Sequence, residues 1–435
     1  MPNELKSKLT FAARIIAAVG GLGVGFVAFY LAFVGRLSDQ FLKYTLQHIE
    51  WAAYLLPAFC LVLISVLRVR FFGGTEGTGI PQTIAALEMK TEGERKEMLS
   101  IKILLGKLFL TTIGLFSGAS LGREGPTVHA GACLMYLCRK VTRFPKYFVQ
   151  RGLILAGGAA GIAAAFNAPV AGIIFSFEEI GRSFDKRNLG IVVVCVLGAC
   201  AVCIGLFGDY WFYGSFQVAL HEWPVWIFVP FIGLSMGALG GLFSLLIIRS
   251  YPSATRQILK HPIFAPLIIG LTIGLIGWLS QGQTLGTGFG EAQMMLMKNK
   301  EMDWSYPILR PAATALTLLS GIPGGLFDPT LSAGASFGQW FSSLIHQFDW
   351  ASEVDSRLIM MIAMACFFTG VVQSPITAVV IMIEMTDSVH ATLPMLGGVV
   401  FAYAISRRIY PSSIYVSLAS NYFSDSRGEA IRFEA

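Results

Sequence analysis

The segment LGREGPTVHAGA, residues 121 to 132, places an arginine beside a glutamate within an apolar part of the chain. A carboxylate inside a membrane is costly and marks a functional site by default. Pro126 and the flanking glycines predict a helix that begins here, because proline in the first turn loses no hydrogen bond. A carboxylate at a helix start competes with a bound anion for the same N–H donors, so Glu124 would link anion binding to proton binding. The alternative is that Glu124 only pairs with Arg123, although sequence neighbours point apart in regular structure.

Three Gly-rich segments each precede an apolar stretch: GTGIP at 77–81, GREGP at 122–126 and GGLFDP at 324–329. All three are predicted helix starts. A helix start exposes unpaired N–H groups and carries about half a positive charge, so several that converge in a membrane form an anion site without a full cation. The alternative is that these segments are only bends between membrane spans.

Two further acids need an explanation. Glu178 and Glu179 follow an apolar run near the predicted cytoplasmic end of a helix, and for Glu179 the alternative to a functional role is simple exposure to water. Asp328 stands in the third Gly-rich segment. It either caps the helix, because Asp-Pro is a favoured helix start, or opposes anion binding with its charge. On the second interpretation, Asp328→Ala would bind an anion more tightly, and the gain would fade at acidic pH.

The composition predicts a membrane protein. Of 435 residues, 54% are hydrophobic and 13% are charged, the mean hydropathy is +0.65, and soluble proteins carry about 25% charged residues. The first apolar run has no cleavage site of the usual kind and is expected to remain. Several runs are interrupted by glycine and proline, which is tolerated in a membrane where the backbone lines a cavity. The apolar runs cover about 10–35, 51–72, 101–120, 152–180, 190–213, 225–249, 262–280, 307–320, 357–385 and 391–405.

Basic residues lie beside these runs, which indicates that their flanks and the N-terminus are cytoplasmic and gives no sign of nucleic-acid binding. The seven cysteines show no CxxC pattern and are expected to be buried apolar side chains, without a disulfide or metal site. The basic clusters are Lys6, Lys8 and Arg14; Arg139, Lys140, Arg143, Lys146 and Arg151; and Arg182, Lys186 and Arg187.

An internal repeat divides the sequence. PTVHAGA (126–132) matches PTLSAGA (329–335) at five of seven positions, with an offset of 203 residues. Pro169 and Glu178 correspond to Pro375 and Glu384 with an offset of 206, and GTGI (77–80) corresponds to GTGF (286–289) with an offset of 209. We therefore predict two membrane repeats, 1–215 and 216–435, with the substrate site between them and no separate soluble domain. In this alignment Glu178 and Glu384 are matched and structural, whereas Glu179 faces Met385.

Together GTGIP, GREGP, FNAPVAGIIFSFEEI, GGLFDP and SPITAVVIMIEMTD resemble the chloride channel (CLC) family of anion channels and proton-coupled anion exchangers, over about residues 10 to 420. The resemblance implies an all-helical polytopic fold of two inverted repeats, a homodimer in membrane lipid, and transport of chloride and protons without a cofactor. It implies that Glu124 is the outer gating glutamate and Glu179 the inner proton-transfer residue. The anion ligands that it implies are Thr78, Gly79, Ile80, Leu326, Phe327 and Tyr415, with Arg123 and Asp328 as possible modulators.

Three departures from the family pattern stand out. Thr78 replaces the usual serine and adds a methyl group. Asp328 replaces a small apolar residue. The chain ends about twenty residues after Tyr415, which leaves no room for the paired regulatory domain of eukaryotic relatives, so a bacterial inner-membrane protein is expected.

Other functions remain as alternatives. A membrane enzyme would use Glu178 and Glu179 or His129, but the sequence has no HExxH zinc motif and no phosphate-binding loop, and His129 fits packing on a helix face better. Within transport, glutamates at both 124 and 179 favour a proton-coupled exchanger over a passive anion channel. Chloride as the transported ion is implied by the resemblance alone, because helix-start N–H groups would also bind fluoride or nitrate.

Overall fold

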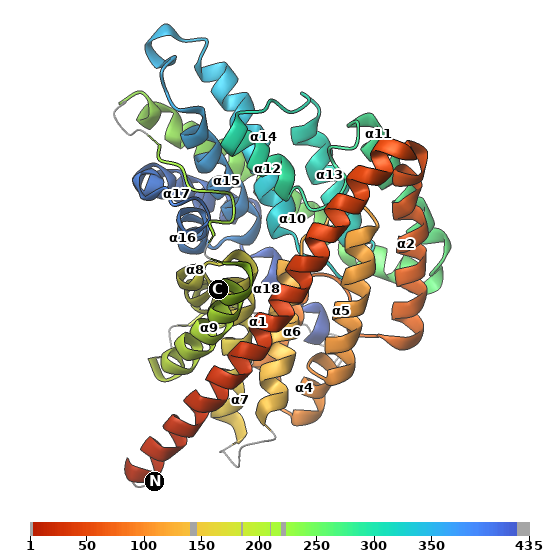
Figure 1. Ribbon diagram of the computed structural model, residues 1–435, viewed down its shortest axis with the longest axis vertical. Coiled ribbons are helices and arrows are strands. Elements are labelled where there is room, and N and C mark those ends of the chain that lie inside the picture. Colours follow the sequence, from red (N-terminus) through yellow and green to blue (C-terminus); the bar gives the residue numbers. More distant parts are fainter. Residues whose placement is uncertain (1–2, 140–145, 184–185, 209, 219–222, 424–435) are drawn as a thin grey trace.

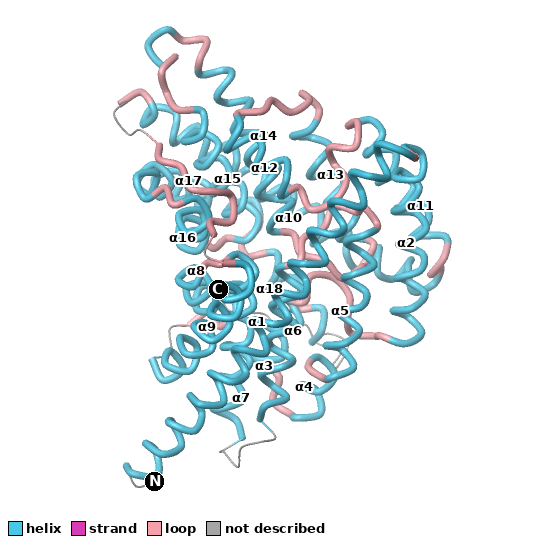
Figure 2. Tube along the Cα trace, viewed as in Figure 1, coloured by secondary structure: helices cyan, strands magenta, loops and turns pink. Residues whose placement is uncertain are grey.

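The computed structural model describes residues 3–139, 146–183, 186–208, 210–218 and 223–423. Lys140 and Arg143 of the predicted basic clusters lie outside these residues. The described chain consists of helices joined by loops (Figure 2). The helices of the first half are α1 (Asn3–His48), α2 (Glu50–Phe71), α3 (Ile80–Glu88), α4 (Glu92–Met98), α5 (Ile101–Phe116), α6 (Glu124–Cys138), α7 (Lys146–Phe166), α8 (Pro169–Phe175) and α9 (Lys186–Phe207).

Short helical turns cover Ser176–Ile180 in the first half and Asp349–Ala351 and Val389–Ala391 in the second half. The second half is likewise built of helices (Figure 1). Its helices are α10 (Val225–Lys260), α11 (Phe264–Leu279), α12 (Phe289–Lys298), α13 (Tyr306–Leu319), α14 (Phe327–Ile345), α15 (Ser356–Val372), α16 (Pro375–Thr386), α17 (Thr392–Ile409) and α18 (Ile414–Ala419).

The helix contacts of the two halves correspond. In the first half α1 packs on α9 and α6 packs on α7; in the second half α10 packs on α17 and α14 packs on α15. Two helices contact their own counterparts across the molecule, since α2 packs on α11 and α8 packs on α16. α18 has no counterpart in this scheme and packs on α3. Residues of the two halves are therefore brought together along the middle of the molecule.

Two of the predicted apolar runs each form two consecutive helices with a break between them. The first breaks between α7 and α8 and the second between α15 and α16. Each break has the same backbone: a left-handed residue, Asn167 or Gln373, then a non-helical residue with a ψ of +78° or +77°, then the proline that begins the next helix. Proline excludes the preceding residue from the helical region, so the helix must restart there. The matched breaks place two helix starts inside the apolar body.

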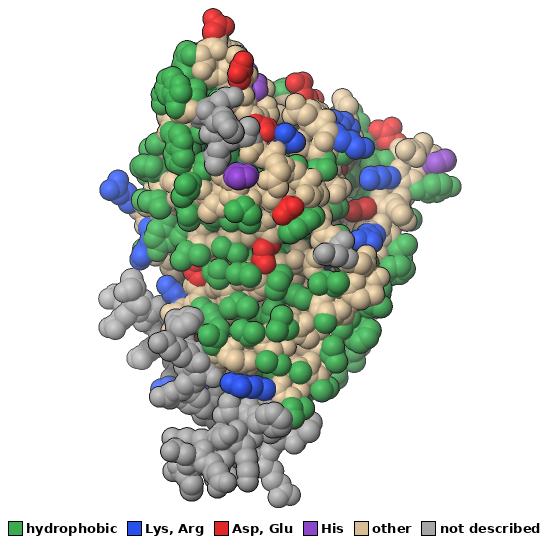
Figure 3. Space-filling view, turned by 60° about the vertical axis from the view of Figure 1, so that its left-hand side comes forward, with side chains coloured by type: hydrophobic (Ala, Val, Ile, Leu, Met, Phe, Trp, Pro, Cys, Tyr) green, Lys and Arg blue, Asp and Glu red, His purple; other side chains and the backbone are tan. Residues whose placement is uncertain are grey.

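The surface suits a lipid environment. Six helices of the described chain are long and apolar enough to cross a membrane. Hydrophobic side chains dominate the middle of the face in Figure 3, and most charged side chains of that face lie toward its top and its edges. The six segments are Ala13–His48, Glu50–Phe71, Glu92–Phe116, Asn188–Phe207, Val225–Lys260 and Val389–Ala419.

Candidate functional site

The starts of α6 and α14 meet at a two-residue bridge. The Gly122 N–H donates to the Gly325 carbonyl oxygen at 2.8 Å, and the Gly325 N–H donates to the Gly122 carbonyl oxygen at 2.6 Å. The loop before α3 joins the same junction, because the Gly324 N–H donates to the Gly77 carbonyl oxygen at 3.3 Å. The three Gly-rich segments are therefore helix starts, as predicted, and they converge.

The turn before α3 depends on a glycine and a buried cation. Gly79 has a φ of +91°, and a Cβ there would lie 2.4 Å from the Cβ of His129, so only glycine fits. The buried Lys107 Nζ donates to the carbonyl oxygens of Thr75 and Gly77 at 3.0 and 2.8 Å. Lys107 was missed by the sequence reasoning, although a lysine in the middle of an apolar helix is a signal in itself.

Glu124 is the first residue of α6 and is fully buried. Its carboxylate lies against the Cα atoms of Gly122 and Gly325, where an added Cβ would be 2.1 and 2.5 Å from Oε2. Neither carboxylate oxygen has a hydrogen-bond donor among the described residues. The ion pairs of the described residues do not join Arg123 to Glu124, and the Arg123 guanidinium lies over the Phe212 ring at 5.7 Å. The alternative of a simple Arg123–Glu124 pair is therefore wrong.

Tyr415 and Thr78 lie near this junction. The buried Tyr415 hydroxyl has no hydrogen-bond partner among the described residues and is close enough to interact electrostatically with Glu124 and Glu179. The Thr78 hydroxyl oxygen accepts from the Ile80 N–H at 3.3 Å. Its own proton remains able to donate to an anion, whereas the Ile80 N–H is shared with this contact.

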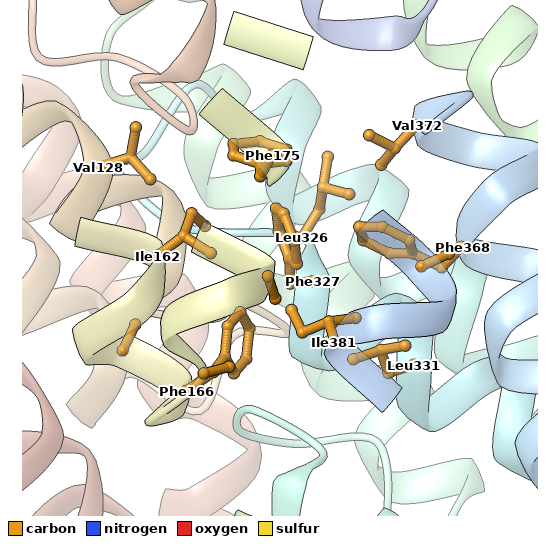
Figure 4. Close-up of a cluster of buried hydrophobic side chains, with 14 of the residues drawn as sticks. Val128, Ile162, Phe166, Phe175, Leu326, Phe327, Leu331, Phe368, Val372 and Ile381 are labelled. Carbon is orange, nitrogen blue, oxygen red and sulfur yellow. The ribbon is translucent and has the colours of Figure 1, made fainter. Parts of the chain in front are cut away.

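Leu326 and Phe327 begin α14, and their N–H groups donate to no backbone carbonyl among the bonds of the described chain. The Phe327 ring is fixed by aromatic neighbours from both halves (Figure 4). Its centroid is 5.6 Å from that of Phe166 and 4.7 Å from that of Phe368, and it stacks on Tyr415 at 6.4 Å. This packing holds the N–H groups in a fixed direction.

Glu179 lies in a π-helical turn, Ser176–Ile180, that extends α8. It is 2% exposed, which excludes the alternative of a side chain in water. Ser374 Oγ donates to its Oε2 at 3.1 Å, and Ser413 Oγ donates to its Oε1. The two serines stand at the starts of α16 and α18 and were missed by the sequence reasoning. π-Helical turns often occur at functional sites.

Glu178 and Glu384 cap helices of the opposite half. Glu178 accepts from the N–H groups of Ile376 and Thr377 at 3.1 and 2.7 Å. Glu384 accepts from those of Val170 and Ala171 at 3.0 and 2.7 Å. The predicted structural role of this matched pair is confirmed.

Asp328 does not cap α14, and that prediction is wrong. The helix begins at Phe327, two residues earlier than an Asp328 cap would place it, with Leu326 at the N-cap position and no side-chain cap. Both the N–H and the hydroxyl of Thr330 donate to the Leu326 carbonyl oxygen. Asp328 instead lines a cavity of about 390 Å³ together with Arg36, Asp39 and Arg123. Its Oδ1 is buried without a hydrogen-bond partner among the described residues.

The remaining candidates are structural. His129 is buried, and its Nε2 bonds with the Met98 carbonyl oxygen at 2.9 Å, as expected for packing. All seven cysteines are free and six of them are buried. The described residues contain no group of three or more metal-ligating side chains.

The voltage gated chloride channel family model matches residues 60–407. The H(+)/Cl(-) exchange transporter ClcA of Vibrio parahaemolyticus is 27% identical over 430 residues, which cover 94% of this chain and 89% of that protein. The protein of the same name from Klebsiella pneumoniae is 29% identical and covers 90% of this chain and 84% of that protein.

Two solved structures share the fold. A slow cyanobacterial Cl-/H+ antiporter superposes with a TM-score of 0.81 at 22% identity and covers 96% of this chain and 98% of its own. A CLC-type fluoride/proton antiporter superposes with a TM-score of 0.79 at 22% identity and covers 94% of this chain and 98% of its own. The chain is therefore an all-helical, multi-pass membrane protein of two inverted repeats, and it belongs to the voltage gated chloride channel family of anion transporters, which are not enzymes.

Proposed function

We propose that this protein exchanges chloride for protons across a bacterial plasma membrane, with its N-terminus in the cytoplasm. The observation that carries the proposal is the pair of buried carboxyl groups that both interact with the Tyr415 hydroxyl: Glu124 where the helix starts meet, and Glu179 held by two serines. A proton route needs a titratable group at each end, and buried acids in a membrane protein mark such routes.

In this proposal the anion binds between Tyr415 and Glu124. The N–H groups at the α3 and α14 starts (Gly79, Ile80, Leu326 and Phe327) face the anion together with the hydroxyl groups of Thr78 and Tyr415. Each helix start contributes partial positive charge, so a single anion can be held without a full cation. When Glu124 is ionised it occupies the outer end of the site, and a proton on Glu124 removes the competition.

The names of the relatives support chloride and proton exchange. Fluoride is the second candidate ion, because a fluoride/proton antiporter has nearly the same fold similarity. We further propose that the repeats 1–215 and 216–435 assemble around this pathway and that the protein is a homodimer.

Purified protein in liposomes tests the proposal. Under an imposed chloride gradient, we expect chloride efflux together with proton movement in the opposite direction, and both should persist when the membrane potential is clamped. Chloride flux without proton movement would establish a passive channel instead. Proton movement with fluoride but not with chloride would identify fluoride as the ion.

A further inference from the structure

We propose that Asp328 is a second outer proton-binding residue, which shares one proton with Glu124 and passes protons between the outer cavity and that glutamate. This inference rests on the proposed function, since it adds a residue to its proton route. The position was noted above only as a possible modulator of anion affinity.

The geometry places the two carboxyl groups together. The side chains of Asp328 and Glu124 lie within hydrogen-bonding reach of each other, and they are 1% and 0% exposed. Two carboxylates can only accept hydrogen bonds, so a bond between them requires one proton. Two adjacent negative charges away from water are strongly unfavourable, which gives a further reason for the pair to hold that proton.

The surroundings offer the pair little other compensation. Both oxygens of Glu124 and Oδ1 of Asp328 lack a donor among the described residues. Tyr213, from the segment between the two halves, is fully buried with an unpartnered hydroxyl and lies near both carboxyl groups. The pair therefore has an unfilled hydrogen-bonding capacity that a proton satisfies.

The charged groups around the pair come from every neighbouring element. Arg123, at the N-cap of α6, and Asp39 of α1 both act on Asp328, and Arg36 of α1 lines the same cavity. Arg310 and Tyr306 of α13 interact with Tyr213. Burial and then the adjacent Glu124 carboxyl group have the largest effects on Asp328.

The location of Asp328 gives the pair a direction. Asp328 lines the cavity with Arg36 and Asp39, which lie in the C-terminal half of α1. Because the N-terminus of α1 is proposed to be cytoplasmic, we assign this cavity to the outer side. Glu124 is absent from its lining and lies against the bridge between Gly122 and Gly325. A proton from outside can protonate the Asp328 carboxylate and then move to the Glu124 carboxylate. Asp328 is ionised again and Glu124 is neutral, with no other atom exchanged. The outward step is the reverse.

Infrared titration of purified protein tests the shared proton without any transport. The band of a protonated carboxyl group should disappear with rising pH at a midpoint that falls by about one pH unit or more in both Asp328→Asn and Glu124→Gln, because each variant replaces a pair by a single acid. Asp39→Asn is the matched control, an acid in the same cavity, and should shift the midpoint much less. An unchanged midpoint in Asp328→Asn, or an equal shift in Asp39→Asn, would overturn the proposal.

Chloride affinity provides a second test. If the pair holds one proton at neutral pH, its net charge is −1, and Asp328→Ala leaves the same charge on Glu124. Affinity should then change less than about twofold at neutral pH and rise several-fold only at alkaline pH, where the wild-type pair loses its proton. Tighter binding already at neutral pH would mean that Asp328 carries its own charge and would overturn the shared proton.

The outcomes for the two proposals remain separate. Absence of coupled flux in wild-type liposomes would reject the proposed exchange, and the infrared titration would still report on the pair. Coupled flux in wild type with an unchanged titration in Asp328→Asn would reject the shared proton alone.

Discussion

The starts of α6 and α14 are built on one backbone plan and carry opposite chemistry. They correspond at an offset of 203 residues and are joined through Gly122 and Gly325. The first helical residue is Glu124 in α6, a buried carboxylate without a donor among the described residues. In α14 it is Phe327, a ring held between aromatic neighbours from both halves.

The turns before α3 and α12 also share a backbone plan between the two halves. Lys107 holds the carbonyl oxygens that precede α3, and Arg310, also 203 residues later, holds those of Thr284 and Gly286 before α12 at 2.8 and 2.9 Å. Gly288 repeats the left-handed conformation of Gly79. Duplication therefore preserved the turns and their buried cations, and the residues that could titrate differ between the halves.

Glu124→Gln removes the contrast between the two helix starts and should have the largest effect. The amide is neutral and cannot take up a proton at physiological pH, so we expect proton movement to be abolished while anion flux continues. Simultaneous recording of chloride and pH in liposomes measures both. Persistent chloride-driven proton uptake would show that Glu124 is not the coupling residue.

Glu179→Gln tests the second asymmetric position, where the other half has Met385. One of the two serine hydroxyl groups, Ser374 or Ser413, can still donate to the amide oxygen and the other can accept from the amide NH2, so the fold should hold, but the proton route loses its inner group. We expect proton movement to fall to background and chloride movement to survive. Equal loss of both fluxes in well-folded protein would favour a structural role for Glu179.

Lys107→Met tests the buried cation that holds the turn before α3. The substitution leaves buried carbonyl oxygens before α3 without their donor, and each such group costs about 1–3 kcal/mol, so we expect a loss of about 3 kcal/mol in the free energy of unfolding. Arg310→Met should cost a comparable amount, because the same contacts are made in the other half. Lys102→Met, on an exposed face of the same helix, is the control for thermal unfolding in detergent. A Lys107 variant as stable as the Lys102 variant would contradict the role of the buried cation.

Removal of the two hydroxyl groups should have a smaller effect. Tyr415→Phe combined with Thr78→Val takes away two donors of the proposed anion site while the packing on Phe327 is kept. A hydrogen bond to a charged partner contributes about 1.5–3 kcal/mol, so chloride affinity should weaken by about tenfold or more. Calorimetry measures the affinity, with Tyr403→Phe as the control. Unchanged affinity would remove both hydroxyl groups from the site.

Much of the fold could be predicted from local patterns. The apolar runs correspond to helices, and the runs 152–180 and 357–385 break at Pro169 and Pro375, because proline cannot follow a helical residue without strain. The equivalence of Glu178 and Glu384 indicated their shared role in capping. The cap interpretation of Asp328 failed, since an Asp-Pro pair suggests a cap, whereas the helix begins at Phe327, with the Thr330 N–H and hydroxyl group both donating to the Leu326 carbonyl oxygen.

The sequence by itself determined the membrane setting, the helix starts and the internal repeat, because hydrophobic length, proline and glycine act on a few neighbouring residues at a time. Only the tertiary structure decided which groups meet: Ser374 and Ser413 at Glu179, and Asp328 at Glu124. These partners are about 200 residues apart in the chain. Whether a buried carboxyl group finds a donor, a cation or a second carboxyl group depends on how the two halves pack, and no short stretch of sequence encodes that contact.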